Sequence, residues 1–170
     1  MNTLQTIVER RSIRQYTGKK IADELINELL KAAMYAPSAR NTQSWQFIVI
    51  KDDEVLNEIP KIHPYAMMVK EASLAVLVCG DLQVEPSPEY NALNCAAATQ
   101  NILLAAHDLG LGAVWLGVYP RTERMNGLST LCKLPGHIIP ISLISIGIPA
   151  GEKPKISQRF KPEKIHLDKW

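Results

Sequence analysis

The sequence predicts a domain that mixes α-helices and β-strands, of the α/β or α+β class. Along the 170 residues, segments with apolar residues at helical spacing are interspersed with short apolar runs of strand length. One run, SLAVLVCG over residues 73–80, is apolar throughout, which is typical of a strand covered by helices on both faces. A chain of this length buries about two thirds of its surface on folding, which one core can provide. We therefore expect a single domain over residues 1–170.

The first part of the chain predicts two helices, a loop and a strand. Helical spacing predicts a short helix over residues 3–10 and a second helix that begins near Asp23 and ends before Pro37. After a polar loop, the aromatic and β-branched run WQFIVI predicts a strand over residues 45–50. The segment 54–72 contains prolines and predicts one or two short helices.

The middle of the chain predicts one long helix. Ser87 followed by Pro88 forms an N-cap and first-turn pair, and the alanine-rich segment runs from there to a stop at Gly110. Apolar residues lie on more than one face of this helix, so we expect it to be central and to contact more than one partner.

The last part of the chain predicts two strands, a helix and a basic tail. The runs AVWLGV (113–118) and ISLISIG (141–147) predict strands on either side of a helix over residues 121–132. The glycines in GLGAVWLG follow a helix and open a strand, which is the reverse of a dinucleotide-binding glycine motif. We expect Gly110 to end the helix and Gly112 to lie in a turn.

Composition and charge exclude several functions. The formal net charge of +2 is too small for a nucleic-acid-binding surface, and no apolar run approaches the roughly 20 residues that span a bilayer. We therefore expect a cytoplasmic protein with no nucleic-acid or membrane partner. Isolated histidines predict no metal site, and no G-x-S-x-G hydrolase motif occurs. The well-separated cysteines indicate reduced core thiols, and they are Cys79, Cys95 and Cys132.

A cluster of arginines follows the first predicted helix. The stretch RRSIR places Arg10, Arg11, Ser12 and Arg14 within five positions of a nearly neutral chain. Such guanidinium groups can bind a phosphate through charge-assisted hydrogen bonds, which are about twice as strong as neutral ones. Alternatively, they are solvated cations at the negative end of a helix dipole. The cluster alone leaves both interpretations open.

The loop PSARNTQSW is a second candidate site. Ser38, Arg40, Asn41 and Gln43 offer donors and acceptors that suit the polar edge of a flat heterocycle. Loops on a rigid scaffold often bind ligands, although the same residue types occur in ordinary loops. Gly117 ends a predicted strand, where a glycine lets a ligand ring approach the backbone.

Four segments, in order, resemble the nitroreductase family of FMN-dependent oxidoreductases: RRSIRQYTGKKI, APSARNTQSWQFIVI, NCAAATQNILLAAHDLGLGAVWLG and IGIPAGEKPKISQRF. The resemblance extends over residues 3–170. It implies an α+β fold with a central, mostly antiparallel sheet wrapped by helices, and an intertwined homodimer with FMN sites at the subunit interface. The long helix would be the central helix of this dimer.

The resemblance also implies roles for individual residues. The residues that would bind the FMN phosphate, ribityl chain and pyrimidine edge are Arg10, Arg11, Ser12, Arg14 and Arg159. Leu116 and Gly117 would pass close to the flavin ring. The residues that would line the isoalloxazine from the other subunit are Pro37, Ser38, Ala39 and Asn41. Arg14 is the cation expected near N1 and the C2 oxygen, where positive charge stabilises the anionic reduced flavin. No side chain is expected to act as a catalytic acid or base.

The implied activity is ping-pong electron transfer. NADH or NADPH would give a hydride to N5 of FMN and leave, and a small acceptor such as a nitroaromatic or a quinone would take the electrons. Residues 52–72 lack the longer insertion that covers the site in larger family members, so the acceptor is not specified. Two alternatives stay open: dehalogenation or flavin fragmentation on the same fold, and a non-catalytic module that binds or stores FMN.

Overall fold

The fold is built on a four-stranded sheet. The computed structural model describes residues 2–152 and 154–170, and its strands lie in the order β1-β2-β4-β3. The strands are β1 (Trp45–Ile50), β2 (Leu74–Asp81), β3 (Gly112–Gly117) and β4 (Ile138–Gly147). Every pair of neighbouring strands is antiparallel. The predicted α+β class with an antiparallel sheet is confirmed.

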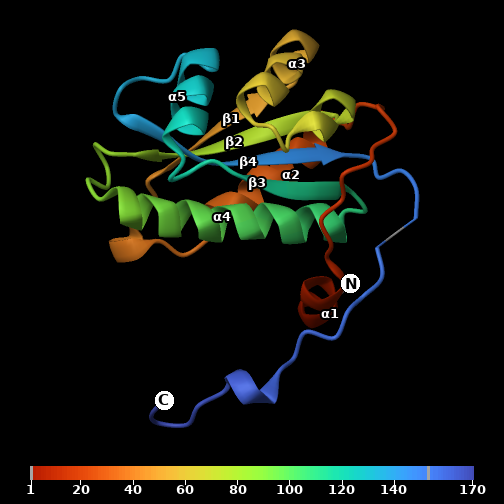
Figure 1. Cartoon of the computed structure of the whole chain (residues 1–170), viewed down its shortest axis with the longest axis vertical. Helices are drawn as coiled ribbons and strands as arrows, with labels where there is room; N and C mark the ends of the chain where they lie inside the picture. Colours follow the sequence, from red (N-terminus) through yellow and green to blue (C-terminus); the bar gives the residue numbers. More distant parts are fainter. Residues whose placement is uncertain (1, 153) are drawn as a thin grey trace.

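Helices cover both faces of the sheet (Figure 1). One pair packs on one face and a second pair on the other, namely α2 (Asp23–Met34) with α4 (Pro88–Asp108), and α3 (Asp53–Ile62) with α5 (Thr122–Leu131). Alternate residues of β2 enter the two cores, so that Val76 packs with α2 and α4 whereas Leu77 packs with α3 and α5. As its apolar sequence predicts, β2 is buried along its whole length.

Helix α4 runs along one face of the sheet, where the sequence predicts a central helix. Ser87 Oγ accepts a hydrogen bond from the Tyr90 backbone N–H at 3.1 Å, which confirms the N-cap. Gly110, just beyond the helix, has a φ of +75°, which confirms it as the helix stop. Packing against both α2 and the sheet explains the several apolar faces of α4. Although α4 has 21 residues, no described helix is long and apolar enough to cross a membrane.

The segment after β1 forms two short helices, as predicted. These are α3, which contains Pro60, and the 3-10 helix η2 (Met67–Glu71). A further 3-10 helix, η1 (Ala39–Asn41), lies in the polar loop before β1.

The cysteines are free thiols in or near the two cores. Cys79 and Cys95 are buried, and Cys132 is half-buried. Burial raises the pKa of Cys95 to about 12 and also raises the pKa of Cys79 and Cys132. Such thiols are unreactive at neutral pH, in agreement with the predicted core packing.

The structure corrects the prediction for Gly112. This residue does not lie in a turn but is the first residue of β3, opposite Gly147 of β4. Ile13 packs directly on it, so that a side chain at this position would collide with Ile13. The glycine is needed for a close approach of two segments rather than for a turn.

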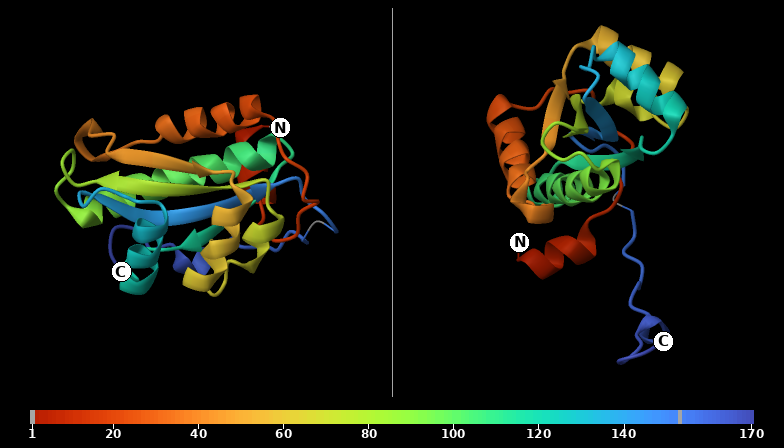
Figure 2. Two further views of the ribbon diagram at one scale, coloured as in Figure 1. Left: turned by 90° about the horizontal axis from the view of Figure 1, so that it is seen from above. Right: turned by 90° about the vertical axis from the view of Figure 1, so that its left-hand side faces the viewer.

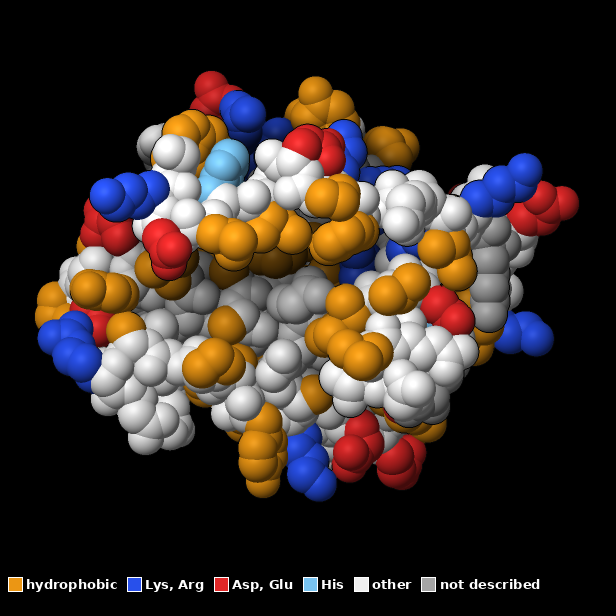
Figure 3. Space-filling view, turned by 90° about the horizontal axis from the view of Figure 1, so that it is seen from below, with side chains coloured by type: hydrophobic (Ala, Val, Ile, Leu, Met, Phe, Trp, Pro, Cys, Tyr) orange, Lys and Arg blue, Asp and Glu red, His pale blue; other side chains and the backbone are white. Residues whose placement is uncertain are grey.

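The two ends of the chain extend away from the sheet and its helices (Figure 1, Figure 2). Helix α1 (Thr3–Glu9) contacts α4, and the tail after β4 contains the 3-10 helix η3 (Pro162–Lys164). Both ends expose large hydrophobic side chains, which are Leu4, Ile7, Val8, Ile156, Phe160, Ile165, Leu167 and Trp170. Figure 3 shows hydrophobic side chains around a hollow on the face seen from below.

Candidate functional site

The arginine-bearing segment lies along β3, at the edge of the sheet. Ser12 forms a parallel bridge with Ala113, and the Ile13 backbone N–H donates to the Ala113 carbonyl at 3.0 Å. The Tyr16 hydroxyl is shared between the carbonyls of Ile13 (2.8 Å) and Ser145 (3.1 Å). Burial raises the pKa of Tyr16 to about 12, so the phenol stays protonated and donates. The segment is therefore held in place at both ends.

Three arginines gather at the start of this segment. Burial, and then the positive charges of Arg159 and Arg11, lower the pKa of the Arg10 guanidinium. Among the residues that the structure describes, no carboxylate forms an ion pair with any of the three. Like charges that share a partly buried site disfavour one another, so the cluster suits an anion. The structure thus brings three predicted site residues together, and their binding role stays a prediction.

Arg11 differs from its neighbours because it already has protein partners. Its Nη1 donates to the carbonyls of Val8 (2.8 Å) and Arg10 (2.7 Å), and its Nε donates to the Lys155 carbonyl at 3.3 Å. A cation is favourable here because the last carbonyls of α1 lack helical partners. Its Nη2 is buried and has no hydrogen-bond partner among the described residues. The helix-end interpretation thus holds for Arg11, and its contact with FMN stays a prediction.

The residues of the arginine-bearing segment line two hollows. Ser12 and Arg14 line a hollow of about 250 Å³. Arg11 lines a different hollow, of about 420 Å³, between the tail and the end of α4. Ile13 lines both hollows, so the two hollows adjoin one another.

The second predicted site, the loop of residues 38–44, precedes β1 at the opposite edge of the sheet. The Ala39 backbone N–H donates to Oδ1 of Asn94 in α4 at 2.8 Å. Arg40 Nη2 donates to Oε2 of the buried Glu85 at 2.6 Å. The loop is therefore fixed to the first half of α4 and to the segment before it.

Within one chain the two predicted sites lie far apart. Arg11 shares a hollow with Asp108 at the end of α4, whereas the 38–44 loop contacts Asn94. These two α4 positions are about 20 Å apart along the helix, at about 1.5 Å per residue. The loop also precedes β1, which lies three strand spacings, or about 14 Å, from β3. The structure does not bring the two sites together in one chain.

The end of β3 provides the third predicted position. An ideal Cβ on Gly117 meets no atom within 4 Å, so the space beside this residue is open. The Leu116 side chain is buried, so only the backbone of Leu116 is available to a ligand. The Gly117 carbonyl accepts a hydrogen bond from Arg124 Nη1 at 2.6 Å and lies 3.0 Å from His63 Nε2. His63 Nδ1 accepts from the Tyr65 backbone N–H at 3.3 Å, so Nε2 carries the proton and donates to Gly117. Burial, and then the charge of Arg124, lower the pKa of His63.

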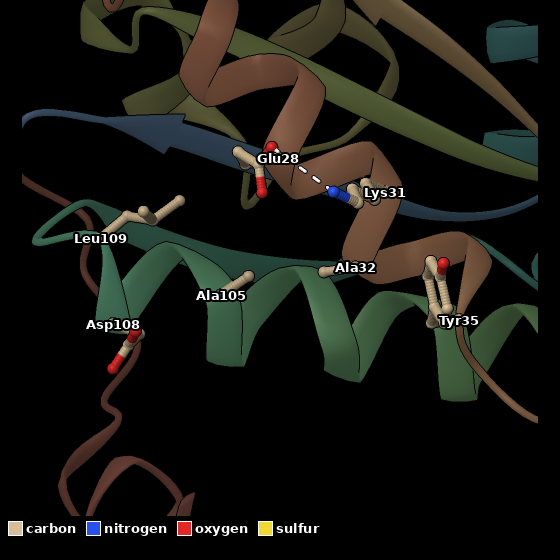
Figure 4. Close-up of a pocket in the computed structure, with 7 residues that line it drawn as sticks. All are labelled: Glu28, Lys31, Ala32, Tyr35, Ala105, Asp108 and Leu109. Carbon is tan, nitrogen blue, oxygen red and sulfur yellow. Dashed lines mark ion pairs between the residues drawn. The ribbon is translucent and has the colours of Figure 1, made fainter. Parts of the chain in front are cut away.

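A groove between α2 and α4 is separate from the predicted site (Figure 4). It has a volume of about 320 Å³ and is lined by Glu28, Lys31, Ala32, Tyr35, Ala105, Asp108 and Leu109. Lys31 Nζ lies 4.0 Å from Glu28 Oε1, so this cation already has a carboxylate partner. Because the groove includes none of the predicted ligand-binding residues, we do not assign it to the site.

The sequence did not indicate four residues that form hydrogen bonds to the predicted site residues, namely His63, Glu85, Asn94 and Arg124. Three of them contact residues 45 to 55 positions away in the chain, which no local pattern indicates. For Asn94 a signal was present, since it is a polar residue on a buried face of a helix.

The structure is that of an α+β protein with a cluster of arginines at the edge of an antiparallel sheet. The model of the Nitroreductase family matches residues 7–83 and 68–148. A Methanothermobacter thermautotrophicus protein, provisionally named NADH dehydrogenase/NAD(P)H nitroreductase, is 48% identical over 100% of this chain and 88% of its own. The chain belongs to the nitroreductase family.

Two solved structures are similar over the whole chain. A Parabacteroides distasonis protein with the same provisional name has a TM-score of 0.93 and 39% identity, with 100% of both chains covered. A provisionally named nitroreductase from Desulfovibrio desulfuricans, described in complex with FMN, has a TM-score of 0.85 and 34% identity, with 100% of this chain and 99% of that chain covered.

Proposed function

We propose that this chain binds FMN and transfers electrons from NADH or NADPH to small electron-poor acceptors, such as nitroaromatics and quinones. The observation that carries the proposal is the cluster of Arg10, Arg11 and Arg159, which has no carboxylate partner among the described residues. The FMN in the Desulfovibrio desulfuricans relative and the NAD(P)H in the names of two relatives support this cofactor and this donor.

The residues present fit FMN at both ends of β3. At its start, Arg10, Ser12 and Arg159 would bind the phosphate and ribityl chain, and Arg11 would assist through its unpartnered Nη2. At its end, the open space beside Gly117 leaves room for a flat ring against the backbone. The two ends are about 17 Å apart at about 3.3 Å per residue, a separation that an elongated ligand with an anionic end, such as FMN, would span.

We infer that the site is completed by a second copy of the chain. The 38–44 loop precedes β1, which lies three strand spacings, or about 14 Å, from β3, so Pro37 and the loop residues Ser38, Ala39 and Asn41 would come from the partner. Leu93 on the outer face of α4 is 66% exposed, and the hydrophobic residues of α1 and the tail are exposed as well. A homodimer that buries these surfaces explains all of them.

FMN, when bound, supplies the redox chemistry by taking a hydride from the nicotinamide and giving electrons to the acceptor. The chain orients the ring and stabilises its negative charge. Arg14, which lines the hollow next to Ser12, would place its positive charge at the pyrimidine edge. No residue needs to act as an acid or a base.

The test is the absorption spectrum of the purified protein, followed by anaerobic rapid mixing with NADH or NADPH. A bound flavin whose absorbance is lost with either nucleotide, and recovered on addition of a quinone, is the expected result. Protein that neither carries nor takes up FMN would contradict the proposal. Bound flavin that neither nucleotide reduces would indicate a storage module. A cytoplasmic location remains a prediction.

A further inference from the structure

The 38–44 loop has a backbone conformation that needs support. Arg40, Asn41 and Gln43 have φ values of +54°, +56° and +51°, in the left-handed region that residues other than glycine rarely adopt. Such residues persist where the surrounding structure holds them, and they are common at ligand sites. The contacts that hold this loop are therefore candidates for a functional role.

Both the oxygen and the nitrogen of the Asn94 side-chain amide form hydrogen bonds to the loop. Its Oδ1 accepts from the Ala39 backbone N–H at 2.8 Å, and its Nδ2 donates to Thr42 Oγ1 (3.3 Å) and Ser44 Oγ (3.2 Å). Asn94 is 3% exposed, so water does not compete for these bonds. One buried side chain thus fixes the loop at three points.

Glu85 provides a second anchor. Its side chain is 1% exposed, and its Oε2 accepts from Arg40 Nη2 at 2.6 Å. Its Oε1 accepts from the Ser87 backbone N–H at 3.1 Å, and this bond, followed by the bond from Arg40, lowers the pKa of Glu85. The Arg40 guanidinium also lies 5.7 Å from the centre of the Tyr90 ring. The side chain of the strained Arg40 is therefore attached to the start of α4.

We propose that Asn94 and Glu85 are positioning residues for the cofactor site of the partner subunit. They hold Arg40 and Ala39, so that the adjacent Ser38 and Asn41 project from a fixed backbone toward the isoalloxazine. Neither residue touches the flavin itself. This inference rests on the proposed function, because the loop has a ligand to position only where two copies share FMN.

The geometry also predicts which substitutions preserve the role. In Asn94→Asp, one carboxylate oxygen still accepts from the Ala39 N–H, and the hydroxyls of Thr42 and Ser44 can rotate to donate instead of accept. In Asn94→Ala all three bonds are lost. Asn101 is a matched control, because it lies in the same helix and donates from Nδ2 to the Ala32 carbonyl at 2.9 Å, away from the loop.

The experiment measures FMN affinity by fluorescence titration and the rate of trypsin cleavage after Arg40, on the full-length protein. Asn94→Ala and Glu85→Ala should each raise the Kd for FMN about tenfold, equivalent to about 1.4 kcal/mol, and should speed cleavage after Arg40. Asn94→Asp should restore both values toward those of the unsubstituted chain, and Asn101→Ala should change neither. If Glu85→Ala does not fold, Glu85→Gln, which keeps an acceptor for Arg40 without the charge, should show the smaller effect in the same direction.

Two results would overturn the positioning role. One is an unchanged Kd and cleavage rate in Asn94→Ala and in the Glu85 variants. The other is an equal effect of Asn101→Ala, which would show that any substitution in α4 changes FMN affinity and cleavage by destabilising the fold. A failure of the unsubstituted chain to bind FMN would instead refute the proposed function, so the two failures are distinguishable.

Discussion

Ile13 lies so close to Gly112 that an ideal Cβ on this glycine would stand 2.7 Å from Ile13 Cγ2. At the other end of the same strand, a Cβ on Gly117 would meet no atom within 4 Å. The first glycine is required by the fold of the chain itself. The second leaves space beside the backbone, and the proposed function assigns this space to the flavin.

Alanine substitutions should separate these two roles. Gly112→Ala should lower the free energy of unfolding by about 1 to 3 kcal/mol, the range for overpacking. Gly117→Ala should change it by less than about 0.5 kcal/mol, as for a surface substitution, but should weaken FMN binding. Urea denaturation of the apoprotein and FMN titration measure the two effects. Equal FMN affinity in Gly117→Ala and the unsubstituted chain would contradict the placement of the ring.

The arginine cluster should favour FMN binding without stabilising the apoprotein. Arg10→Ala and Arg14→Ala should each weaken FMN binding by about 1.5 to 3 kcal/mol, the range for hydrogen bonds to charged groups. Because Arg10 is close to the charges of Arg11 and Arg159, Arg10→Ala should not destabilise the apoprotein. Titration and thermal unfolding of the same variants check both statements. Unchanged affinity in both variants would show that these arginines serve the fold alone.

Arg11→Ala should behave differently from Arg10→Ala. It removes the donor to the Val8 and Arg10 carbonyls, so the backbone amides of α1 should exchange with deuterium faster. Arg10→Ala, which leaves that donor in place, serves as the matched control. Hydrogen exchange measured by mass spectrometry resolves this segment. Equal exchange of α1 in the two variants would contradict the structural role assigned to Arg11.

His63 should make the protein sensitive to acid. Its pKa is lowered in the fold, so the unfolded chain binds a proton first as the pH falls below the ordinary value of about 6.5. The free energy of unfolding should therefore decrease on acidification from about pH 6.5 downward. His63→Gln can still donate to the Gly117 carbonyl but does not titrate, so its unfolding should depend less on pH in this window. Parallel pH profiles for the two proteins would contradict this account.

Tyr16 should have the opposite dependence, at alkaline pH. Its pKa is raised to about 12, so the unfolded chain loses the phenolic proton first as the pH rises above the ordinary value of about 10. The free energy of unfolding should therefore fall as the pH rises from about 10 to about 12. Tyr16→Phe should lose about 1 kcal/mol at neutral pH, because the carbonyls of Ile13 and Ser145 lose their donor, and should lack this alkaline decrease. Denaturant titrations at several pH values test both parts, and an alkaline decrease that persists in Tyr16→Phe would refute the assignment.

Local patterns predict most of the elements of this fold. The Ser87 N-cap, the Gly110 stop and the apolar run of β2 each depend on neighbouring residues, and the structure confirms all three. The prediction for Gly112 was wrong because the need for a glycine comes from Ile13, about 100 positions away in the sequence.

The candidate site was predictable only in part, for the same physical reason. Residues that offer charge or hydrogen bonds to a ligand are visible as residue types, as in RRSIR. The residues that hold them, such as Glu85 for Arg40 and His63 for Gly117, depend on contacts that exist only in the folded chain. The family resemblance supplied the order of the motifs but not these supporting contacts.

The central claim is that each FMN lies between the arginines of one chain and the loop of another, and mixed dimers test it most directly. One chain would carry Arg10→Ala and Arg14→Ala, the other would carry Ser38→Ala and Asn41→Ala, and two affinity tags would select the mixed dimer. The measurement uses an FMN concentration that saturates the unsubstituted protein but neither variant homodimer. We expect the mixed dimer to bind half as much FMN as the unsubstituted dimer. The reason is that one of its two sites has both intact arginines and an intact loop. A mixed dimer that binds no more FMN than the variant homodimers would show that arginines and loop act within one chain, and would contradict the account.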